Sequence, residues 1–250
     1  MSEPSPLAGR GVLITGGSRG LGNALAHELA RRGARLLLVA RGEGELERTA
    51  AAVRAAGGEA HAYAADVGDR DAVHRIAGVA AAMLGETDVV VHDASTLGPT
   101  PLRLLADTAC EDLQRVLDVN LVGPFRLTKA LLGPMLLRGR GLIVHLTSDA
   151  AVEAYPRWGA YGAAKAALDH LARIWAAELA GTGVRFLGID PGEMDTAMHA
   201  AAVPDADRSA LARPADVAVA VADLLGDSLL GDPSVPGGSR IVVADGRAQR

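Results

Sequence analysis

A tyrosine and a lysine lie four residues apart in the segment Tyr161-Gly162-Ala163-Ala164-Lys165. In a helix, this spacing places both side chains on one face. A free tyrosine has a pKa of about 10 and exchanges protons poorly at neutral pH. A nearby lysine cation favours the phenolate and should lower the pKa of Tyr161 toward the useful range. The pair therefore predicts an acid–base centre, with a solvated amphipathic pair as the competing interpretation.

Two further polar residues precede this pair. Ser148 follows an apolar run and could donate a hydrogen bond to a developing oxyanion. Asn120 lies inside a predicted helix, where it could hold a water molecule or break the helix locally. Taken singly, a serine such as Ser148 is more often a strand-end cap, and an asparagine such as Asn120 is more often a satisfied buried amide. Their joint placement with Tyr161 and Lys165 favours the catalytic interpretation.

A glycine-rich turn follows the first apolar run, with the sequence Thr15-Gly16-Gly17-Ser18-Arg19-Gly20-Leu21-Gly22. Gly16 permits a tight turn, Gly20 lets the backbone approach a pyrophosphate, and Gly22 lets the next helix pack on the strand. The N–H groups and the dipole at that helix start would bind the phosphates. The spacing differs from G-x-G-x-x-G, so the position of the turn between a strand and a helix carries this prediction.

Charge at the end of the second apolar run bears on which dinucleotide binds. Ala40 stands where an acid would hold a ribose 2′-hydroxyl, and Arg41 follows it. Arg19 could bring a second guanidinium to a 2′-phosphate, although both arginines could instead be solvated surface residues. Together they favour NADP(H). At the end of the third run, Asp66-Val67 could contact the adenine amino group, or Asp66 could cap a helix.

The elements that must position these residues are seven short apolar runs alternating with six helical segments. The runs are Gly11–Thr15, Arg35–Val39, Glu59–Ala64, Asp88–His92, Leu142–Thr147, Val184–Ile189 and Arg240–Val243. The helices are expected near 20–32, 43–56, 69–85, 111–138, 158–180 and 214–226. This alternation predicts an α/β fold: a Rossmann-like, doubly wound, seven-stranded parallel sheet with helices on both faces.

We expect a single dinucleotide-binding and catalytic domain over 1–250, with residues 1–8 flexible. The segment 193–213 is weakly patterned and is expected to be a mobile substrate lid containing at most one helical turn. Hydrophobic residues make up 49% of the chain but aromatics only 3%, which suits an aliphatic core between helices and sheet. The net charge of −5 disfavours nucleic acid as a partner.

The same sequence bears on location and on metal binding. No apolar run reaches membrane-spanning length, and residues 1–10 lack the layout of a signal peptide. Cys110 is the only cysteine, which excludes an intrachain disulfide and a cysteine metal cluster. We therefore expect a soluble cytoplasmic protein that binds no metal, no membrane and no nucleic acid.

Over Leu7 to Asp245 the chain resembles the short-chain dehydrogenase/reductase family in its single-domain form. The family pattern T-G-x-x-x-G-x-G is met at Thr15–Gly22, and the tetrad Asn-Ser-Tyr-Lys is matched by Asn120, Ser148, Tyr161 and Lys165. The resemblance implies that Tyr161 is the acid–base, that Lys165 also binds the nicotinamide ribose, that Ser148 orients the substrate and that Asn120 anchors a relay water.

The resemblance also extends to the cofactor contacts. It implies that Pro191-Gly192 and Thr196 contact the nicotinamide amide, that Asp66-Val67 contacts adenine, and that Arg19 and Arg41 mark an NADP-preferring member. The full expected NADP(H)-binding set is Gly16, Ser18, Arg19, Gly20, Leu21, Arg41, Asp66, Val67, Asp93, Ala94, Tyr161, Lys165, Pro191, Gly192, Met194 and Thr196. Similar proteins dimerise through the helices near 111–138 and 158–180, so a homodimer or homotetramer is expected.

One segment departs from the family pattern. Members usually carry Asn-Asn-Ala-Gly after the fourth strand, whereas this chain has His92-Asp93-Ala94-Ser95. Ser95 adds a Cβ where glycine lets the backbone approach the cofactor, and Asp93 replaces an amide by a group that is usually only an acceptor. We expect the change to affect local hydrogen bonding and cofactor affinity, with His92 in a structural role.

The substrate pocket is expected between the segments after Ser148, before Tyr161 and after Gly192. That nominates the wall residues Asp149, Glu153, Tyr155, Trp158, Met194, Met198 and His199, with Trp158 equally suited to a subunit contact. No arginine cluster that would demand a phosphate or carboxylate is evident, since Arg157 stands alone. The fold does not name the substrate.

We expect an NADPH-dependent oxidoreductase of the carbonyl reductase type, which moves a hydride between the nicotinamide and a carbonyl or secondary alcohol. Two alternatives remain. One is a non-catalytic NADP(H)-binding sensor, which only the altered segment 92–95 favours. The other is an epimerase or dehydratase that uses transient hydride transfer, whose members generally carry a longer substrate domain.

Overall fold

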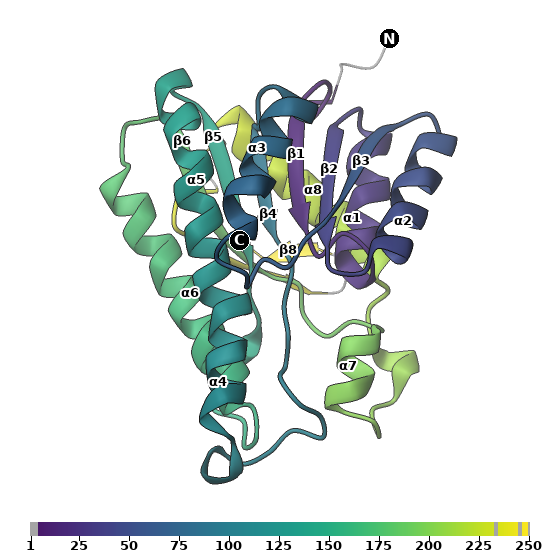
Figure 1. The fold of residues 1–250 in the computed structure, drawn as a ribbon, viewed down its shortest axis with the longest axis vertical. Helices are drawn as coiled ribbons and strands as arrows, with labels where there is room; N and C mark the ends of the chain where they lie inside the picture. The colour runs from purple at the N-terminus through teal and green to yellow at the C-terminus, as the bar shows by residue number, and fades with distance from the viewer. Residues whose placement is uncertain (1–4, 233–234, 245–246, 250) are drawn as a thin grey trace.

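The computed structural model describes residues 5–232, 235–244 and 247–249 of the 250-residue chain. The strands are β1 (Gly11–Thr15), β2 (Arg35–Ala40), β3 (Glu59–Ala64), β4 (Val89–His92), β5 (Gly141–Leu146), β6 (Val184–Asp190), β7 (Arg240–Ala244) and β8 (Arg247–Gln249). The helices are α1 (Gly20–Arg31), α2 (Glu43–Ala55), α3 (Ala72–Leu84), α4 (Cys110–Leu117), α5 (Gly123–Arg138), α6 (Gly159–Glu178), α7 (Ala197–Ala202) and α8 (Pro214–Leu230). Figure 1 shows how they are arranged.

The strands form one sheet in the order β3-β2-β1-β4-β5-β6-β7-β8. All pairs from β3 to β7 are parallel, which confirms the predicted seven-stranded parallel sheet. The short strand β8 pairs with β7 in the antiparallel sense and was not predicted, because Arg247–Gln249 contains no apolar run. The strand order reverses between β1 and β4, and open α/β sheets bind ligands at the carboxyl ends of the strands beside such a point.

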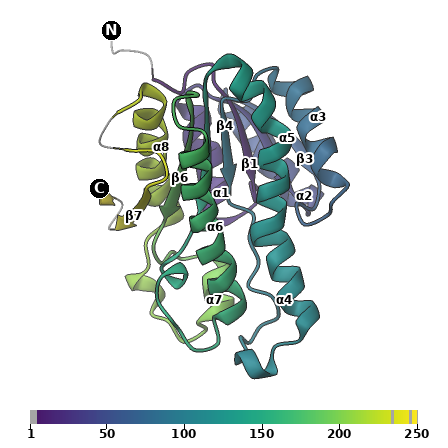
Figure 2. The same ribbon diagram turned by 90° about the vertical axis from the view of Figure 1, so that its left-hand side faces the viewer.

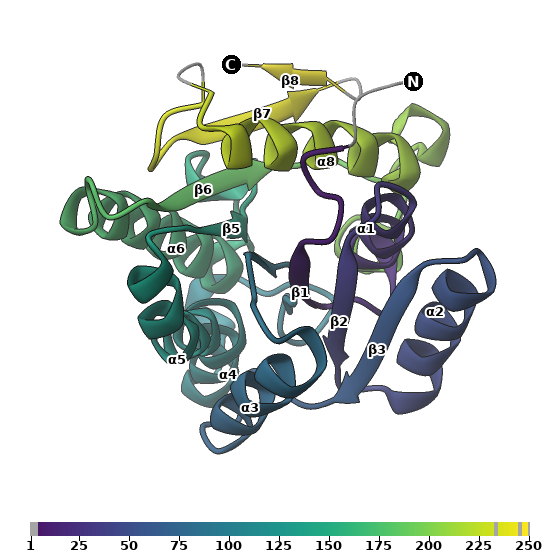
Figure 3. The same ribbon diagram turned by 90° about the horizontal axis from the view of Figure 1, so that it is seen from above.

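Helices cover both faces of the sheet, as predicted, and Figure 3 shows the two layers in a view from above. Helices α1, α2 and α8 enclose one apolar core, and α3, α5 and α6 enclose the other. Strand β1 serves both cores, because Val12 and Ile14 point into the first and Leu13 into the second. All five residues of β1 are buried, which explains why the strand is apolar throughout.

The helix expected over 111–138 is two helices separated by a π-helical segment, Asp118–Val122. Asn120 lies within this segment, so the predicted local break of the helix at this residue is confirmed. The side-chain amide of Asn120 bonds to the backbone of Thr96, and Pro124 occupies the start of α5. The wider turn places Asn120 next to the loop that follows β4.

The segment expected to be a lid, 193–213, contains α7 and a short turn at Arg208–Ala210. Its ends are joined by a parallel bridge between Met194 and Ala212. Figures 1 and 2 show α4, the lower part of α6 and α7 extending beyond the carboxyl ends of the strands. These three elements therefore surround the edge of the sheet where the expected site residues lie.

Residues 1–4 of the segment expected to be flexible lie outside the described residues, and Leu7 is fully buried in the core. Among the residues that the structure describes, no helix has the length and apolarity to cross a membrane. Within the same residues, no group of three or more His, Cys, Asp or Glu side chains is placed to hold a metal ion.

Candidate active site

Tyr161 and Lys165 lie on one face of α6, as their spacing predicts. Tyr161 is 9% exposed and packs against Leu97 and Ala150. The Nζ of Lys165 lies 5.5 Å from the centre of the Tyr161 ring. It also donates a 2.6 Å hydrogen bond to the carbonyl oxygen of Leu146, at the end of β5. This bond fixes the ammonium group between helix and sheet.

The pKa of Tyr161 does not follow the expectation. Burial raises it, the hydrogen-bonding interaction with Ser148 lowers it, and the charges of nearby aspartates raise it further, so the net direction is upward. Lys165 does not reverse this direction, and its ammonium group donates to the Leu146 carbonyl oxygen. Burial lowers the pKa of Lys165 to about 8, against the opposing effect of nearby aspartates. The lysine therefore titrates closer to neutrality than the tyrosine.

Ser148 follows β5 and begins a short turn at Asp149–Ala151. Its hydroxyl donates to Asp149 Oδ1 at 2.8 Å and accepts from the Ala150 N–H at 3.2 Å. The other carboxylate oxygen of Asp149 accepts a 2.9 Å bond from the Tyr155 hydroxyl. Ser148 therefore caps the turn and also interacts with Tyr161, and its role as an oxyanion donor stays a prediction.

Asn120 is 1% exposed, and its side chain is a satisfied buried amide. Its Oδ1 accepts from the Thr96 N–H at 2.8 Å, and its Nδ2 donates to the Thr96 carbonyl oxygen at 2.9 Å. The π-helical segment that carries it packs against α6. The structure therefore brings Ser148, Tyr161 and Lys165 into mutual reach, while the amide of Asn120 holds the loop after β4 beside them.

The glycine-rich turn between β1 and α1 has the backbone that the sequence predicts. Gly16 and Gly20 have positive φ angles of 82° and 53°. A Cβ at Gly22 would lie 2.4 Å from the carbonyl oxygen of Gly16, so the close packing of helix on strand requires glycine. A Cβ at Gly20 would lie 3.5 Å from Thr196 Cγ2, which places the turn beside the segment after β6. These two segments form a cradle suited to a dinucleotide.

Not every expected cofactor residue presents a side chain to this cradle. Leu21 and Val67 are buried in the two apolar cores, which leaves only their backbone for a ligand. Ser18 lies in the turn, where its carbonyl oxygen accepts from the Thr49 hydroxyl. Asp66 accepts from the Gly68 N–H at 2.9 Å and binds Arg115 at 2.5 Å.

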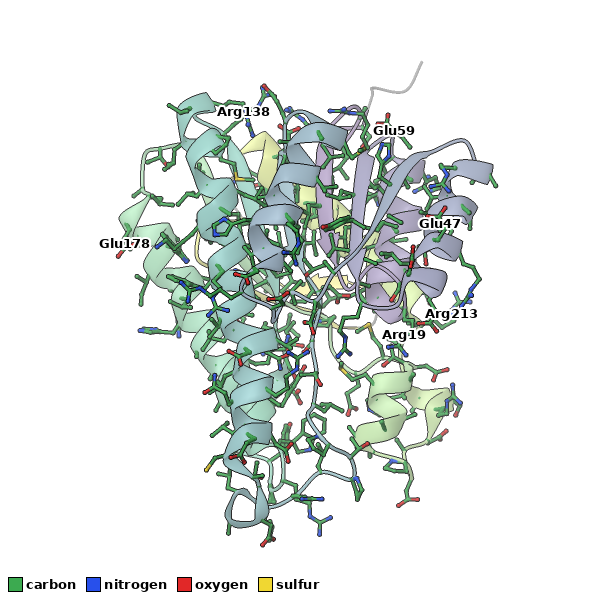
Figure 4. The ribbon with its side chains drawn as sticks, viewed as in Figure 1. Arg19, Glu47, Glu59, Arg138, Glu178 and Arg213 are labelled. Carbon is green, nitrogen blue, oxygen red and sulfur yellow. The ribbon has the colours of Figure 1, made fainter. Side chains whose placement is uncertain are left out.

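The two arginines expected to bind a 2′-phosphate are both exposed. Arg19 forms a 3.3 Å ion pair with Glu45, and its side chain is 66% exposed. Arg41 has no ion pair among the described residues, and its charge lowers the pKa of Asp66. Figure 4 places Arg19 toward α7, at the end opposite Glu59, which begins β3. Arg19 thus lies at the carboxyl edge of the sheet.

The motif after β6 begins with a constrained turn. Asp190 Oδ1 accepts from the Gly192 N–H at 3.0 Å, and Gly192 has a φ of 70°. The hydroxyl of Thr196 accepts from the His199 N–H at 3.1 Å and so caps α7. Met194 forms the bridge that closes the base of the segment 193–213. Pro191-Gly192 and Thr196 therefore occupy fixed positions opposite the glycine-rich turn.

The altered segment 92–95 has a clear structural effect. The buried carboxyl of Asp93 accepts from the Gly22 N–H, and its Oδ2 would lie 2.9 Å from a Cβ at Gly16. Burial raises the pKa of Asp93 to about 7, although Lys165 and the Gly22 bond lower it. Ala94 donates its N–H to Thr15 Oγ1 at 3.2 Å. Asp93 thus lies beneath the glycine-rich turn and supports it.

The two other changed positions differ in their contacts. His92 Nε2 lies 3.1 Å from Thr128 Oγ1, and the histidine is 2% exposed, which fits the expected structural role. The Oγ of Ser95 is buried and has no hydrogen-bond partner within the described part of the chain.

A pocket adjoins Tyr161 on the side of the loop after β4. Its lining residues are Leu97, Gly98, Pro99, Leu102, Arg103, Thr108, Asp112, Val116, Arg157, Ala160 and Tyr161. The sequence did not reveal that Arg103 joins Arg157 here, because they come from separate loops. Trp158, nominated for the pocket wall, packs edge-on against Tyr161 with ring centres 5.7 Å apart.

Three charged residues near the site were missed by sequence reasoning. Arg240 forms ion pairs with Asp169 and Asp190 beside Ser148. The sequence could have indicated Asp169, because it follows Lys165 by four residues and so lies on the same helix face. The position of Arg240 depends on strand pairing and carries no local signal.

Comparison of this chain with known proteins identifies its family. The family model for short chain dehydrogenases matches residues 10–207. A short chain dehydrogenase of Pseudocercospora fijiensis is 35% identical over 199 residues, or 78% of this chain. The match covers 62% of that relative, so the chain spans less than two thirds of its length.

Two solved structures extend the likeness to the fold. A metagenomic short-chain oxidoreductase in complex with NADP matches this chain with a TM-score of 0.76 and 30% sequence identity. The match covers 89% of this chain and 92% of the oxidoreductase chain. NAD⁺-bound xylitol dehydrogenase matches this chain with a TM-score of 0.84 and 27% sequence identity. The match covers 95% of this chain and 98% of the xylitol dehydrogenase chain. The matched family is one of oxidoreductases that use NAD(P), and the chain belongs to it: it is a short-chain dehydrogenase/reductase.

Proposed function

We propose that this protein is an NADPH-dependent oxidoreductase that transfers a hydride between the nicotinamide and a carbonyl or secondary alcohol carbon. The observation that carries the proposal is the grouping of Tyr161, Ser148 and Lys165 at the carboxyl edge of the sheet. The glycine-rich turn and Thr196 lie at the same edge and form the cradle for the dinucleotide.

NADPH, when bound, supplies the hydride for reduction. Tyr161 protonates the carbonyl oxygen of the substrate, and Ser148 donates a hydrogen bond to the same oxygen as charge develops there. To do so, the Ser148 hydroxyl must turn from Asp149, its acceptor at 2.8 Å, toward the substrate. Lys165 holds a positive charge beneath the Tyr161 ring and favours the phenolate once the proton has left.

The preference for NADPH rests on Arg41 and Arg19. Arg41 is exposed at the end of β2, and no acid among the described residues forms an ion pair with it. The Arg19–Glu45 pair is exposed and therefore weak, so a 2′-phosphate can replace Glu45. A planar guanidinium binds phosphate with two parallel hydrogen bonds.

The test of cofactor choice is a titration with NADPH and with NADH, followed by nicotinamide fluorescence. We expect tighter binding of NADPH, and a loss of about 1–3 kcal/mol in NADPH affinity when Arg19 and Arg41 are both changed to alanine. The affinity for NADH should change little, and Arg48→Ala on the exposed surface of α2 is the control. Equal losses for both cofactors would refute the role of the 2′-phosphate.

Turnover is tested by adding a panel of ketones and aldehydes to the NADPH complex. Oxidation of NADPH on addition of a carbonyl supports the reductase. Tight NADPH binding without turnover across the panel would favour the sensor, and racemisation or dehydration without net NADPH oxidation would favour the epimerase or dehydratase.

A further inference from the structure

Arg240, the first residue of β7, reaches across the ends of its neighbouring strands. Its Nη2 donates to Asp190 Oδ2 at 2.6 Å and to the carbonyl oxygen of Ser148 at 3.1 Å. Its Nε lies 3.3 Å from Asp169 Oδ2 on α6. One guanidinium therefore joins the end of β5, the end of β6 and the helix that carries Tyr161.

The carboxylates in this cluster are almost removed from solvent. The side chains of Asp190 and Asp169 are 5% and 9% exposed, and that of Arg240 is 25% exposed. A buried carboxylate is costly unless a cation and hydrogen bonds compensate it. The second oxygen of Asp190 accepts from the Gly192 N–H, so Arg240 and Gly192 hold this carboxylate from two sides.

The cluster also adjoins Lys165, which precedes Asp169 by one turn of α6. The charges of Asp169 and Asp190 raise the pKa of Lys165, against the larger effect of burial. The other titratable groups near Lys165 are Tyr161 on the same helix, Asp93 after β4, His92 on β4 and His145 on β5. Arg240 faces this group of charges from β7.

We propose that Arg240 is a positioning residue for the reaction: it fixes the backbone of Ser148 against Asp190 and neutralises the two carboxylates beside Lys165. The inference rests on the proposed function, because it assigns Arg240 to act through Ser148 and Lys165. The substitution Arg240→Met removes the donor to the Ser148 carbonyl and leaves both carboxylates without their cation. Their uncompensated charge then favours protonated Lys165.

The chain offers a direct readout of this effect, because Lys129 and Lys165 are its only lysines. NMR of the protein labelled with ¹³C at the lysine ε carbon gives two titrating signals, and Lys129→Arg assigns them. The variants are Arg240→Met and Arg240→Lys, each measured for the Lys165 titration midpoint and for kcat and KM. The matched control is Arg185→Met, since Arg185 on β6 donates to the carbonyl oxygens of Ser228 and Val235, where no active-site carboxylate is bound.

We expect Arg240→Met to raise the Lys165 midpoint by about one pH unit and to lower kcat about tenfold, with a smaller change in KM for NADPH. Arg240→Lys keeps the charge but not the planar fork, so it should hold the midpoint near the wild-type value and still lower kcat. Arg185→Met should leave the midpoint unchanged and affect mainly thermal stability.

Two results would overturn the proposal: a Lys165 midpoint in Arg240→Met equal to that of the wild type, or a loss of kcat no larger than in Arg185→Met. If Arg240→Met does not fold, a wild-type kcat in Arg240→Lys refutes the positioning role. Failure of the proposed function is distinct, because it would appear as a wild-type protein without turnover. The NMR titration then still decides whether Arg240 compensates the charges beside Lys165.

Discussion

Asp93 shows how one changed residue can alter the chemistry beneath a binding site. Its carboxyl accepts the N–H of Gly22 within the packed base of the glycine-rich turn, and burial raises its pKa to about 7. The folded chain therefore holds this proton more tightly than the unfolded chain, in which an aspartate has a pKa of about 4. The protonated Asp93 carboxyl makes its whole contribution to the free energy of unfolding below about pH 4. This contribution is lost as the pH rises to about 7.

Asp93→Asn should remove this dependence, because an amide oxygen accepts the Gly22 N–H without becoming charged. We expect the variant to be more stable than the wild type at pH 8, by at most on the order of 4 kcal/mol, with the difference shrinking toward pH 5. Thermal unfolding from pH 5 to pH 8 measures it. Asp69→Asn, at an exposed aspartate, is the control. A difference in stability that stays constant with pH would show that Asp93 does not titrate in this range.

At the scale of elements, the start of α5 packs closely against the segment that follows β3. A Cβ at Gly123 would lie 2.4 Å from the carbonyl oxygen of Val67, which follows β3 beside Asp66. Gly78, within α3, has open space at its Cβ position. Two helical glycines therefore have opposite structural requirements.

Gly123→Ala should destabilise the protein by about 1–3 kcal/mol, because the added methyl group must displace the Val67 backbone. It should also weaken NADPH binding through the shifted Asp66. Gly78→Ala should raise stability by up to about 1 kcal/mol, since alanine favours the helix. Chemical denaturation of both variants provides the comparison, and an equal effect at the two positions would contradict the close contact.

The sequence predicts the regular elements well because their cause is local. Strands such as Val89–His92 are buried on both faces, so each appears as an uninterrupted apolar run. The Tyr161–Lys165 pair is equally local, since helix geometry alone sets its separation. By contrast, β8 is too short for a pattern, and α7 has only six residues within a weakly patterned segment.

What the sequence could not predict depends on contacts between distant segments. Ser148, Asp169, Asp190 and Arg240 meet only because β5, β6 and β7 pair in one register. The pKa of Tyr161 was expected in the wrong direction for a similar reason. The Tyr161–Lys165 spacing gives proximity, but neither the extent of burial nor the bond that directs Lys165 to the Leu146 carbonyl.

At the scale of the whole molecule, we expect a homodimer or homotetramer that uses the face formed by α5 and α6. Leu137 on α5 is 91% exposed and Ile174 on α6 is 39% exposed, so both apolar side chains are available for such a contact. Ile174→Glu should shift the protein toward the 25.6 kDa monomer, because a buried charge at an apolar contact is unfavourable. Light scattering measures the mass, with Met83→Glu on α3, 44% exposed, as the control. Equal masses for the wild type and Ile174→Glu would exclude this face.

The most direct measurement follows the transferred hydrogen itself. NADPH carrying deuterium in place of both hydrogens at the nicotinamide C4 is incubated with the protein and a carbonyl substrate, and the alcohol product is analysed by mass spectrometry. The proposed reaction predicts one deuterium on the carbinol carbon of the wild-type product. Tyr161→Phe should lose at least about 100-fold in rate while it still binds NADPH, whereas Tyr63→Phe, at a tyrosine on β3, should stay active. An alcohol product without deuterium, or full activity of Tyr161→Phe, would contradict hydride transfer with Tyr161 as the proton donor.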